Sequence, residues 1–242
     1  MKQYETLERL NREIIECSNC PRLVSFRSKV AKEKRRQFAT SEYWGRPVPG
    51  FGDPKARLVI VGLAPASHGG NRTGRVFTGD SSARFLVSHL HKAGFANQPV
   101  SESRDDGLRY RDCYITAAVR CVPPDNKPTS EEMENCFPYL VRELALLTNA
   151  KVILALGRIA FDSVLELASR AEAGTKAKKT KFVFQHGQSY QFAENFPTVF
   201  ASYHPSPRNT NTGKLTDAMF SKVLRDINRT LGNKIPTSKV AR

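Results

Sequence analysis

Four cysteines in this chain have the spacing of ligands for one metal centre. Cys17 and Cys20 form a close pair, and Cys121 and Cys136 form a wider pair much later in the sequence. Prolines stand beside or near these cysteines and favour rigid loops, which tetrahedral zinc or a four-iron cluster requires. The spacing therefore predicts that two remote segments meet at one inorganic centre, and it leaves zinc and iron–sulfur both open.

Other uses of cysteine are less consistent with the sequence. A redox pair of the thioredoxin kind lies where a strand opens into a helix, whereas Cys17 and Cys20 follow a helical stretch and precede Pro21. Cys113 stands in an apolar run and has no partner by spacing, so we assign it to the core. An odd cysteine count, with neither a secretory signal nor a membrane-spanning stretch, predicts a reducing, cytoplasmic location and no membrane partner.

A second group of residues combines an aromatic ring with directional polar groups. Asn71, Arg72 and Asp80 are concentrated in one long connection with Phe77 among them, and His204 follows a later apolar run. Holding a single nucleobase requires an aromatic face and a few hydrogen-bonding groups. The glycines in the same connection match neither a phosphate loop nor a dinucleotide fingerprint, so no nucleotide cofactor is predicted. Ordinary turn chemistry is the other interpretation of these segments.

The elements that must position these residues alternate between strand and helix. Short apolar runs predict four buried strands, at 57–63, 112–119, 151–156 and 198–203. Amphipathic periodicity predicts helices at 4–15, 23–38, 81–93, 130–147, 158–168 and 214–231. This order predicts one α/β domain over residues 1–242, with the carboxyl ends of parallel strands converging on one cleft. The polar, lysine-rich stretch 170–181 is expected to be an exposed loop.

The charge of the chain indicates a polyanionic partner. The formal net charge is +15 over 242 residues, and basic residues gather at 32–36, at 176–181 and in a tail from about residue 232. Nucleic acid is the first candidate for such a surface, although a generally basic, solvated surface has the same composition.

Three motifs, together with the cysteine spacing, resemble the family-5 uracil-DNA glycosylases of the iron–sulfur branch. They are Gly62-Leu63-Ala64-Pro65-Ala66, the run from Asn71 to Asp80, and His204-Pro205-Ser206-Pro207. The resemblance extends from Cys17 to about Leu224. It implies a three-layer α/β/α fold with a central four-stranded parallel sheet, and a [4Fe-4S] cluster held by the four paired cysteines. It also implies substrate-binding roles for Gly62, Ala64, Ala66, Asn71, Arg72 and Phe77.

The resemblance implies hydrolysis of the N-glycosidic bond of uracil in DNA, which leaves an abasic site. Asp80, Asn126 and His204 are the implied catalytic residues, and Phe77 is the expected stacking partner of the extruded base. The first motif ends in Pro65 and Ala66, which lack the polar side chain that many relatives use to orient water. A pocket with fewer base-specific hydrogen bonds predicts a broader substrate range, including hypoxanthine. We expect a monomer that binds DNA containing deaminated bases.

Two other functions compete with this interpretation. A non-catalytic, zinc-containing nucleic-acid-binding protein would explain the positive charge and the thiolates, but it gives no reason for Asp80 and His204 to share a cleft. A nuclease would need several carboxylates around divalent metals, and the strand ends supply too few.

Overall fold

The fold is built on one mixed six-stranded sheet with the order β1-β3-β2-β4-β6-β5. The computed structural model describes residues 5–171 and 182–233. Four strands, β2 (Leu58–Gly62), β3 (Cys113–Ala117), β4 (Val152–Leu156) and β6 (Thr198–Ser202), run parallel. These confirm the predicted parallel strands. Two-residue strands, β1 (Phe51–Gly52) and β5 (Ser189–Tyr190), add antiparallel edges that were not predicted.

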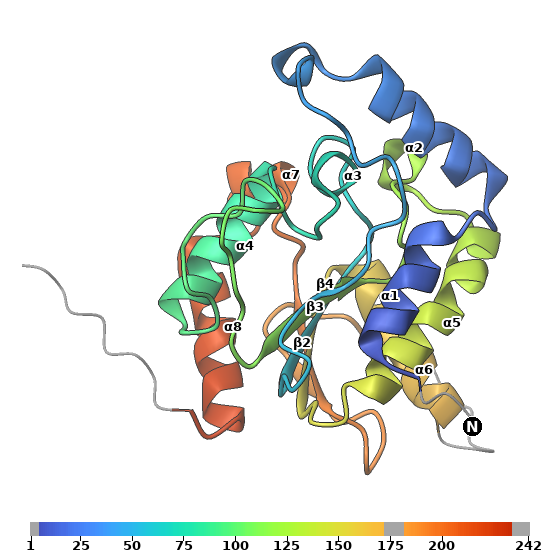
Figure 1. Cartoon of the computed structure of the whole chain (residues 1–242). Helices are drawn as coiled ribbons and strands as arrows, with labels where there is room; N and C mark the ends of the chain where they lie inside the picture. Colours follow the sequence, from blue (N-terminus) through green and yellow to red (C-terminus); the bar gives the residue numbers. More distant parts are fainter. Residues whose placement is uncertain (1–4, 172–181, 234–242) are drawn as a thin grey trace, which may run out of the picture.

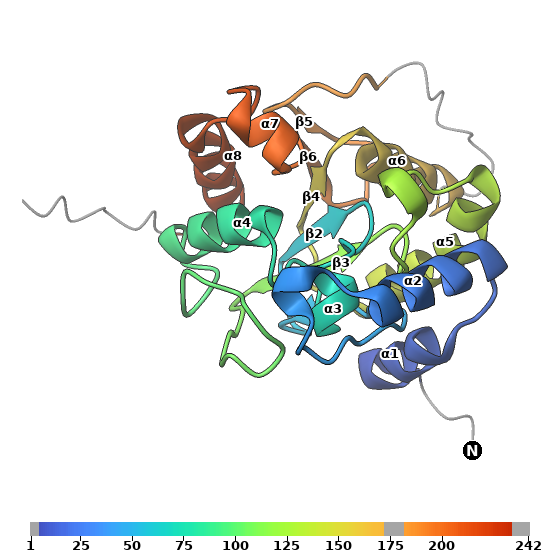
Figure 2. The ribbon, with the colours of Figure 1, turned by 90° about the horizontal axis from the view of Figure 1, so that it is seen from above.

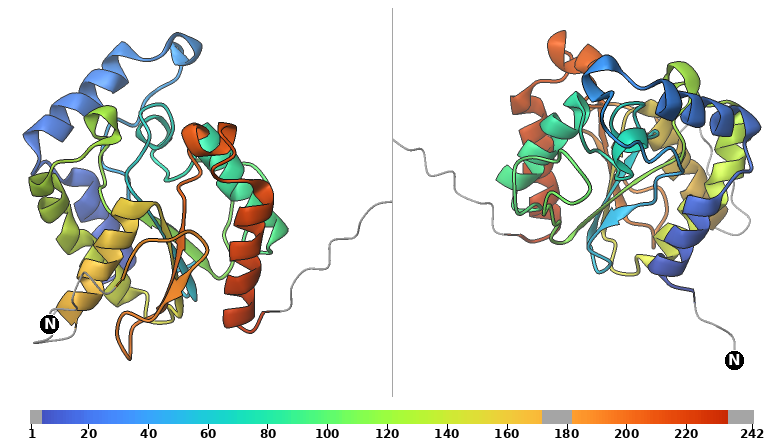
Figure 3. Two further views of the ribbon diagram at one scale, coloured as in Figure 1. Left: turned by 180° about the vertical axis from the view of Figure 1, so that it is seen from behind. Right: turned by 45° about the horizontal axis from the view of Figure 1, so that its top comes forward.

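The four parallel strands are almost entirely apolar because helices cover both faces of the sheet. Leu58 and Ile60 of β2 point to one face, where they pack with residues of α4 (Ser81–Lys92) and α8 (Asp217–Thr230). Val59 and Val61 point to the other face, toward α5 (Ser130–Leu146) and α6 (Arg158–Ala171). Figures 1 and 3 show the sheet between these two helix layers. The predicted α/β fold is therefore confirmed.

Two amino-terminal helices complete the second layer and extend beyond it. Helix α1 (Leu7–Glu16) packs on α5, and α2 (Pro21–Glu33) lies across the edge of the sheet where the strands end (Figure 2). The single helix predicted at 23–38 is wrong, because Lys34 adopts a left-handed backbone with φ of 52° and ends α2. The chain then forms the short 3₁₀ helix η1 (Arg36–Phe38).

The other predicted helices are confirmed to within a few residues, and three further short elements were not predicted. These are α3 (Gly70–Thr73), the 3₁₀ turn η2 (Pro124–Asn126) and α7 (Pro207–Asn211), each of which follows a parallel strand. Together they surround the carboxyl edge of the sheet, so they are the elements that can build a site there.

Several expectations concern residues that the structure does not describe. Most of the lysine-rich stretch, 172–181, and most of the basic tail, 234–242, lie outside the described residues, while Arg170 and Ala171 belong to the end of α6. The single-domain assignment stays a prediction. Within the described ranges, no helix is long and apolar enough to cross a membrane.

Candidate active site and metal centre

Asp80 stands at the start of α4, where its side chain caps the helix. Its Oδ1 accepts a hydrogen bond from the backbone N–H of Ala83 at 2.9 Å. The other carboxylate oxygen occupies space that Gly69 leaves free, since a Cβ atom on Gly69 would lie 1.9 Å from Oδ2. Burial raises the pKa of Asp80, while backbone hydrogen bonds and the charge of Arg72 oppose that rise. The carboxylate is therefore held in a confined, partly dehydrated position.

Arg72 fixes the backbone that leads into Asp80. Its Nε donates to the carbonyl of His68 at 2.8 Å and its Nη2 donates to the carbonyl of Gly79 at 3.2 Å. The guanidinium also lies 4.1 Å from the centroid of the Phe38 ring in η1. These contacts occupy Arg72 inside the protein, so they support a positioning role. The predicted contact with substrate stays a prediction.

Phe77 joins the segment that carries Asp80 to the end of β6. Its backbone is left-handed, with φ of 44°, and its ring lies against Gly62 at the end of β2. A Cβ atom on Gly62 would approach the ring to 2.9 Å, which explains the glycine in this motif. The Phe77 and His204 rings are stacked, with centroids 5.9 Å apart and planes inclined by 29°. The predicted stacking residue and His204 thus lie side by side.

His204 lies two residues after the end of β6 and packs close to Gly157. A Cβ atom on Gly157, which follows β4 with φ of 92°, would lie 3.4 Å from the His204 Cβ. The carbonyl of His204 accepts a hydrogen bond from Asn209 Nδ2 at 2.8 Å. Burial lowers the pKa of His204 to about 4, so the imidazole is neutral at neutral pH. A neutral ring can donate one N–H to a developing anion.

His186 is a contributor to this region that the sequence did not reveal. Its Nδ1 accepts a hydrogen bond from the backbone N–H of Tyr203 at 3.1 Å, and the two rings stack at 4.9 Å with an 11° inclination. The contact fixes the residue before His204. It depends on the short β5–β6 pairing, and no motif around His186 predicts that pairing.

The structure does not bring every predicted site residue into this group. Asn126 is exposed in η2, and no hydrogen bond within the described residues joins its side chain to Asp80 or His204. Asn71 is buried, and its Nδ2 donates to the carbonyl of Arg27 in α2 at 3.2 Å. Ala66 contributes its carbonyl to the turn that begins α3, and Ala64 packs against the cysteine-bearing core. Substrate roles for these residues stay predictions.

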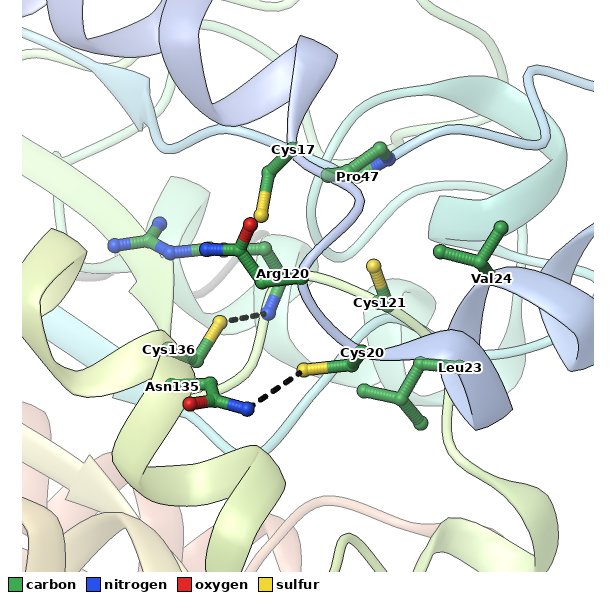
Figure 4. Close-up of a pocket in the computed structure, with 10 residues that line it drawn as sticks. Cys17, Cys20, Leu23, Val24, Pro47, Arg120, Cys121, Asn135 and Cys136 are labelled. Atoms are coloured by element: carbon green, nitrogen blue, oxygen red, sulfur yellow. Dashed lines mark hydrogen bonds between the residues drawn. The ribbon is translucent and has the colours of Figure 1, made fainter.

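The four paired cysteines line one cavity, as Figure 4 shows. Cys17 ends α1, Cys20 precedes α2, Cys121 follows β3, and Cys136 lies within α5. The space free of protein atoms there is about 320 Å³, including the part that opens to solvent. Segments from both parts of the chain therefore meet at one set of thiols.

Neighbouring N–H groups already point at these sulfurs. The backbone N–H of Arg120 donates to Cys136 Sγ at 3.2 Å, Arg27 Nη1 donates to Cys121 Sγ at 3.3 Å, and Asn135 Nδ2 lies 3.7 Å from Cys20 Sγ. Burial raises the pKa of Cys121 to about 12 and that of Cys136 to about 11. Thiolates at these positions therefore need a bound cation to stabilise them.

Four thiols are a donor set that fits a four-iron cluster and also tetrahedral zinc. Within the described residues, no three cysteine, histidine or acidic side chains gather closely enough to hold a single ion. A zinc ion needs four donors at about 2.3 Å from one point, whereas a cluster binds each cysteine to its own iron and holds the sulfurs further apart. Cys113 lies buried in β3, as expected for a core residue.

Comparison with known proteins identifies the class of this fold and site. The sequence profile of the uracil DNA glycosylase superfamily matches residues 49–228, and the chain belongs to this superfamily. Its identity to type-5 enzymes, 46–48%, exceeds its identity to type-4 enzymes, 28–33%, which confirms the family inferred from the motifs. Type-5 uracil-DNA glycosylases of Thermus thermophilus and Pyrobaculum aerophilum are 48% and 47% identical to it over 216 and 212 residues.

These similarities extend over most of each protein. The Thermus alignment covers 89% of this chain and 94% of the relative, and the Pyrobaculum alignment covers 88% of both. A type-5 enzyme of Mycobacterium leprae is 46% identical over 94% of this chain and 96% of its own length. These alignments, of 212 to 228 residues, are longer than the stretch 49–228 that the superfamily profile matches, so the similarity is not confined to that stretch.

Proposed function

We propose that this protein is a DNA-repair glycosylase that hydrolyses the N-glycosidic bond of uracil in DNA. The proposal is supported by the contacts of the Phe77 ring with Gly62 and with His204 in a superfamily fold, and by Asp80, which caps α4 three residues after Phe77. An aromatic ring, a confined carboxylate and a neutral imidazole are the groups that excision of an extruded base requires. A zinc-containing binding protein has no use for this arrangement.

In the proposed mechanism the target base leaves the helix and stacks on Phe77. The bond between the sugar C1′ and the base nitrogen breaks with its electron pair on the base, which leaves as an anion. The sugar becomes an oxocarbenium-like cation, and a water oxygen then bonds to C1′ while its proton passes to Asp80 or to solvent. Asp80 stabilises the cation and positions the water, and His204 donates to a carbonyl oxygen of the departing anion.

Asn126 has the least structural support among the proposed catalytic residues. Its assistance to water activation rests on the resemblance of the loop after Cys121, since its exposed side chain has no described contact with Asp80. Single-turnover excision by an Asn126→Ala variant tests the assignment. Full activity would remove Asn126 from the mechanism.

We further propose that Cys17, Cys20, Cys121 and Cys136 hold a [4Fe-4S] cluster. When bound, the cluster supplies a covalent link that joins α1 and α2 to the sheet and α5. A yellow-brown colour with iron and sulfide in the purified protein supports the cluster, whereas a colourless protein with zinc overturns it.

The substrate range is proposed to include hypoxanthine as well as uracil. Pro65 and Ala66 supply no polar side chain where a uracil-specific hydrogen bond would reject other bases, so selectivity should be modest. Excision of the two bases from otherwise identical duplexes tests this, and strict uracil specificity would contradict it. We also propose that the protein acts as a cytoplasmic monomer. Light scattering of the purified protein gives its molecular mass and so tests whether it is a monomer.

The decisive experiment is excision from a labelled duplex that contains one uracil. Incubation followed by alkaline cleavage should give a single product at the uracil position, and a matched duplex with thymine should stay intact. Binding of both duplexes without cleavage of either would overturn the proposed activity in favour of a binding protein.

A further inference from the structure

Three arginines are buried within the described residues, and two of them have a carboxylate partner. Arg75 pairs with Asp106 at 2.7 Å, and Arg120 pairs with Glu143 at 2.7 Å. Arg27, in α2, is only 8% exposed, and no carboxylate of the described residues lies within ion-pair distance of it. Its Nε has no hydrogen-bond partner there, as is also true of Arg120 Nε, so the missing carboxylate is what distinguishes Arg27. Arg27 is thus the exception among the buried arginines.

An unpaired buried cation carries a large energetic penalty. Removing a guanidinium from water is strongly unfavourable unless an opposite charge and hydrogen bonds compensate it. The contacts of Arg27 are the sulfur of Cys121, 3.3 Å from Nη1, and the carbonyl of Cys17, 3.4 Å from Nη2. Both belong to proposed cluster ligands. Neither a thiol nor a carbonyl neutralises the guanidinium, so the missing negative charge must come from something bound between them.

We propose that Arg27 is the counter-cation of the iron–sulfur centre, an inference that rests on the proposed cofactor. Four thiolates outweigh the positive charge of a four-iron core, so the ligated centre is an anion. Arg27 faces it with a hydrogen bond to Cys121 Sγ and a positive charge. The net charge of such a centre and the hydrogen bonds to its sulfurs both set its reduction potential. The positive charge of Arg27 and its hydrogen bond to Cys121 both favour the reduced form of the cluster.

Arg120 shows why this role falls to Arg27 alone. Arg120 also lines the cavity, but Glu143 compensates the charge of its side chain, and Thr116 accepts a further hydrogen bond from it. Only the backbone N–H of Arg120 donates to a cysteine. The two buried arginines near the thiols therefore differ in the charge that they offer to the centre.

Arg27 also connects the centre to the glycosylase site. Its carbonyl accepts a hydrogen bond from Asn71 Nδ2 at 3.2 Å, and Asn71 directly precedes Arg72, which holds the backbone before Asp80. The amide that sequence reasoning assigned to substrate thus joins α3 to the helix that carries Arg27. This link uses the backbone of residue 27, so the Arg27 variants leave it in place.

The test compares the complete iron-loaded protein with three variants purified without oxygen. Arg27→Met removes the charge and keeps the volume, Arg27→Lys keeps the charge with fewer donors, and Lys29→Met removes an exposed charge from the same helix. Protein-film voltammetry measures the reduction potential, and absorbance measures the rate of cluster loss to an iron chelator.

We expect Arg27→Met to shift the potential to more negative values and to lose its cluster about tenfold faster or more, as expected for loss of a hydrogen bond to a charged group. The potential and the rate of cluster loss of Arg27→Lys should fall between those of Arg27→Met and the unmodified protein, and those of Lys29→Met should match the unmodified protein.

An unchanged potential and rate in Arg27→Met would overturn the inference. If that variant does not fold, a potential unchanged in Arg27→Lys and Arg27→Gln overturns it. An unmodified protein without iron would instead overturn the cofactor itself, and a cluster-bearing protein without excision would overturn the proposed activity alone.

Discussion

Asp80 has two roles, in structure and in the proposed chemistry, that require different properties of one side chain. As the cap of α4 it needs only an oxygen acceptor, which an amide supplies as well as a carboxylate. As the proposed group beside the sugar cation it must be ionised, although burial raises its pKa and so opposes ionisation. A raised pKa means that the folded state binds this proton more tightly than the unfolded state. The ionised carboxylate therefore reduces stability at neutral pH.

Asp80→Asn should separate these roles. The amide keeps the cap and removes the buried charge, so we expect a melting temperature above that of the unmodified protein at pH 7. Single-turnover excision of uracil should fall by about 10² or more, within the usual range for loss of a general base or charge-stabilising group. The stability gain should vanish as the pH falls below the pKa of Asp80, because both proteins are then neutral at this position. Full excision by the variant, or a loss of stability at pH 7, would contradict the assignment.

His204 gives the opposite dependence of stability on pH. Its pKa is about 4 in the folded protein against an ordinary value of 6.5, so the unfolded chain binds this proton first as the pH falls. The contribution of neutral His204 is complete above pH 6.5 and is lost as the pH falls toward 4. The shift corresponds to about 3 kcal/mol.

We expect the unmodified protein to lose stability faster than His204→Asn between pH 6.5 and 4, in urea unfolding at constant ionic strength. His186 also has a lowered pKa and titrates in this window in both proteins, so the difference between the two curves isolates His204. Parallel curves of stability against pH for the two proteins would show that the fold does not hold His204 neutral. The variant should also excise uracil more slowly at pH 7, because the amide is a weaker match for the developing anion.

The helices and strands differ in how well the sequence predicted them. The parallel strands and long helices follow from apolar runs and from a 3.6-residue period, and the structure confirms them. The end of α2 was missed, because nothing in the local pattern indicates that Lys34 adopts a left-handed backbone. Short α3 and α7 were missed because elements of four or five residues show no period.

The site was predictable where residue type alone restricts the chemistry. Four paired cysteines, an aspartate before a helix and a histidine after a strand stand out in the sequence. By contrast, Gly69 and Arg27 act through space that only the folded chain defines. Gly69 makes room for a carboxylate eleven positions away, and Arg27 meets Cys121 across two distant segments. Neither contact has a local signature.

The metal centre should decide whether the amino-terminal helices stay attached. The core around Leu10, Ile14 and Leu23 is small, and its remaining members include the cysteines themselves. We expect chelation of the iron, or Cys136→Ala, to increase hydrogen exchange through α1 and α2, while the central strands stay protected. Hydrogen exchange read by mass spectrometry measures both regions at once.

Cys113→Ala is the matched control for that experiment. It removes a buried thiol from β3 that has no place in the cavity, so the protein should keep its iron and the protection of α1 and α2. Unchanged exchange in α1 and α2 after iron removal would show that apolar packing alone holds these helices.

At the scale of the whole molecule, positive charge surrounds the edge where the strands end. Four exposed arginines lie there without a carboxylate partner in the described part of the chain: Arg35 and Arg36 at η1, Arg84 in the first turns of α4, and Arg208 in α7. Figure 2 looks down on this edge, with α2, α4 and α7 around it. The η1 turn is held close to the site because Arg72 lies over the Phe38 ring. A duplex placed with its base at Phe77 would therefore meet cations on several sides.

Removing these charges should weaken DNA binding through the phosphate backbone and leave the chemical step unchanged. Every phosphate that the protein no longer neutralises should reduce the slope of log affinity against log salt by roughly one, so Arg35→Ala with Arg36→Ala should reduce it by up to about two.

Arg109→Ala with Arg111→Ala removes the same charge just before β3, at the opposite edge of the sheet, where both side chains are exposed. Binding is measured by fluorescence anisotropy on an uncleavable uracil analogue over a range of salt concentrations, and excision is measured at saturating enzyme. The pair at η1 should change the slope and the pair before β3 should not, since only the former faces the bound strand. Equal effects of the two double variants would mean that the charge acts as a general field of the whole surface, and that no particular edge of the sheet holds the DNA.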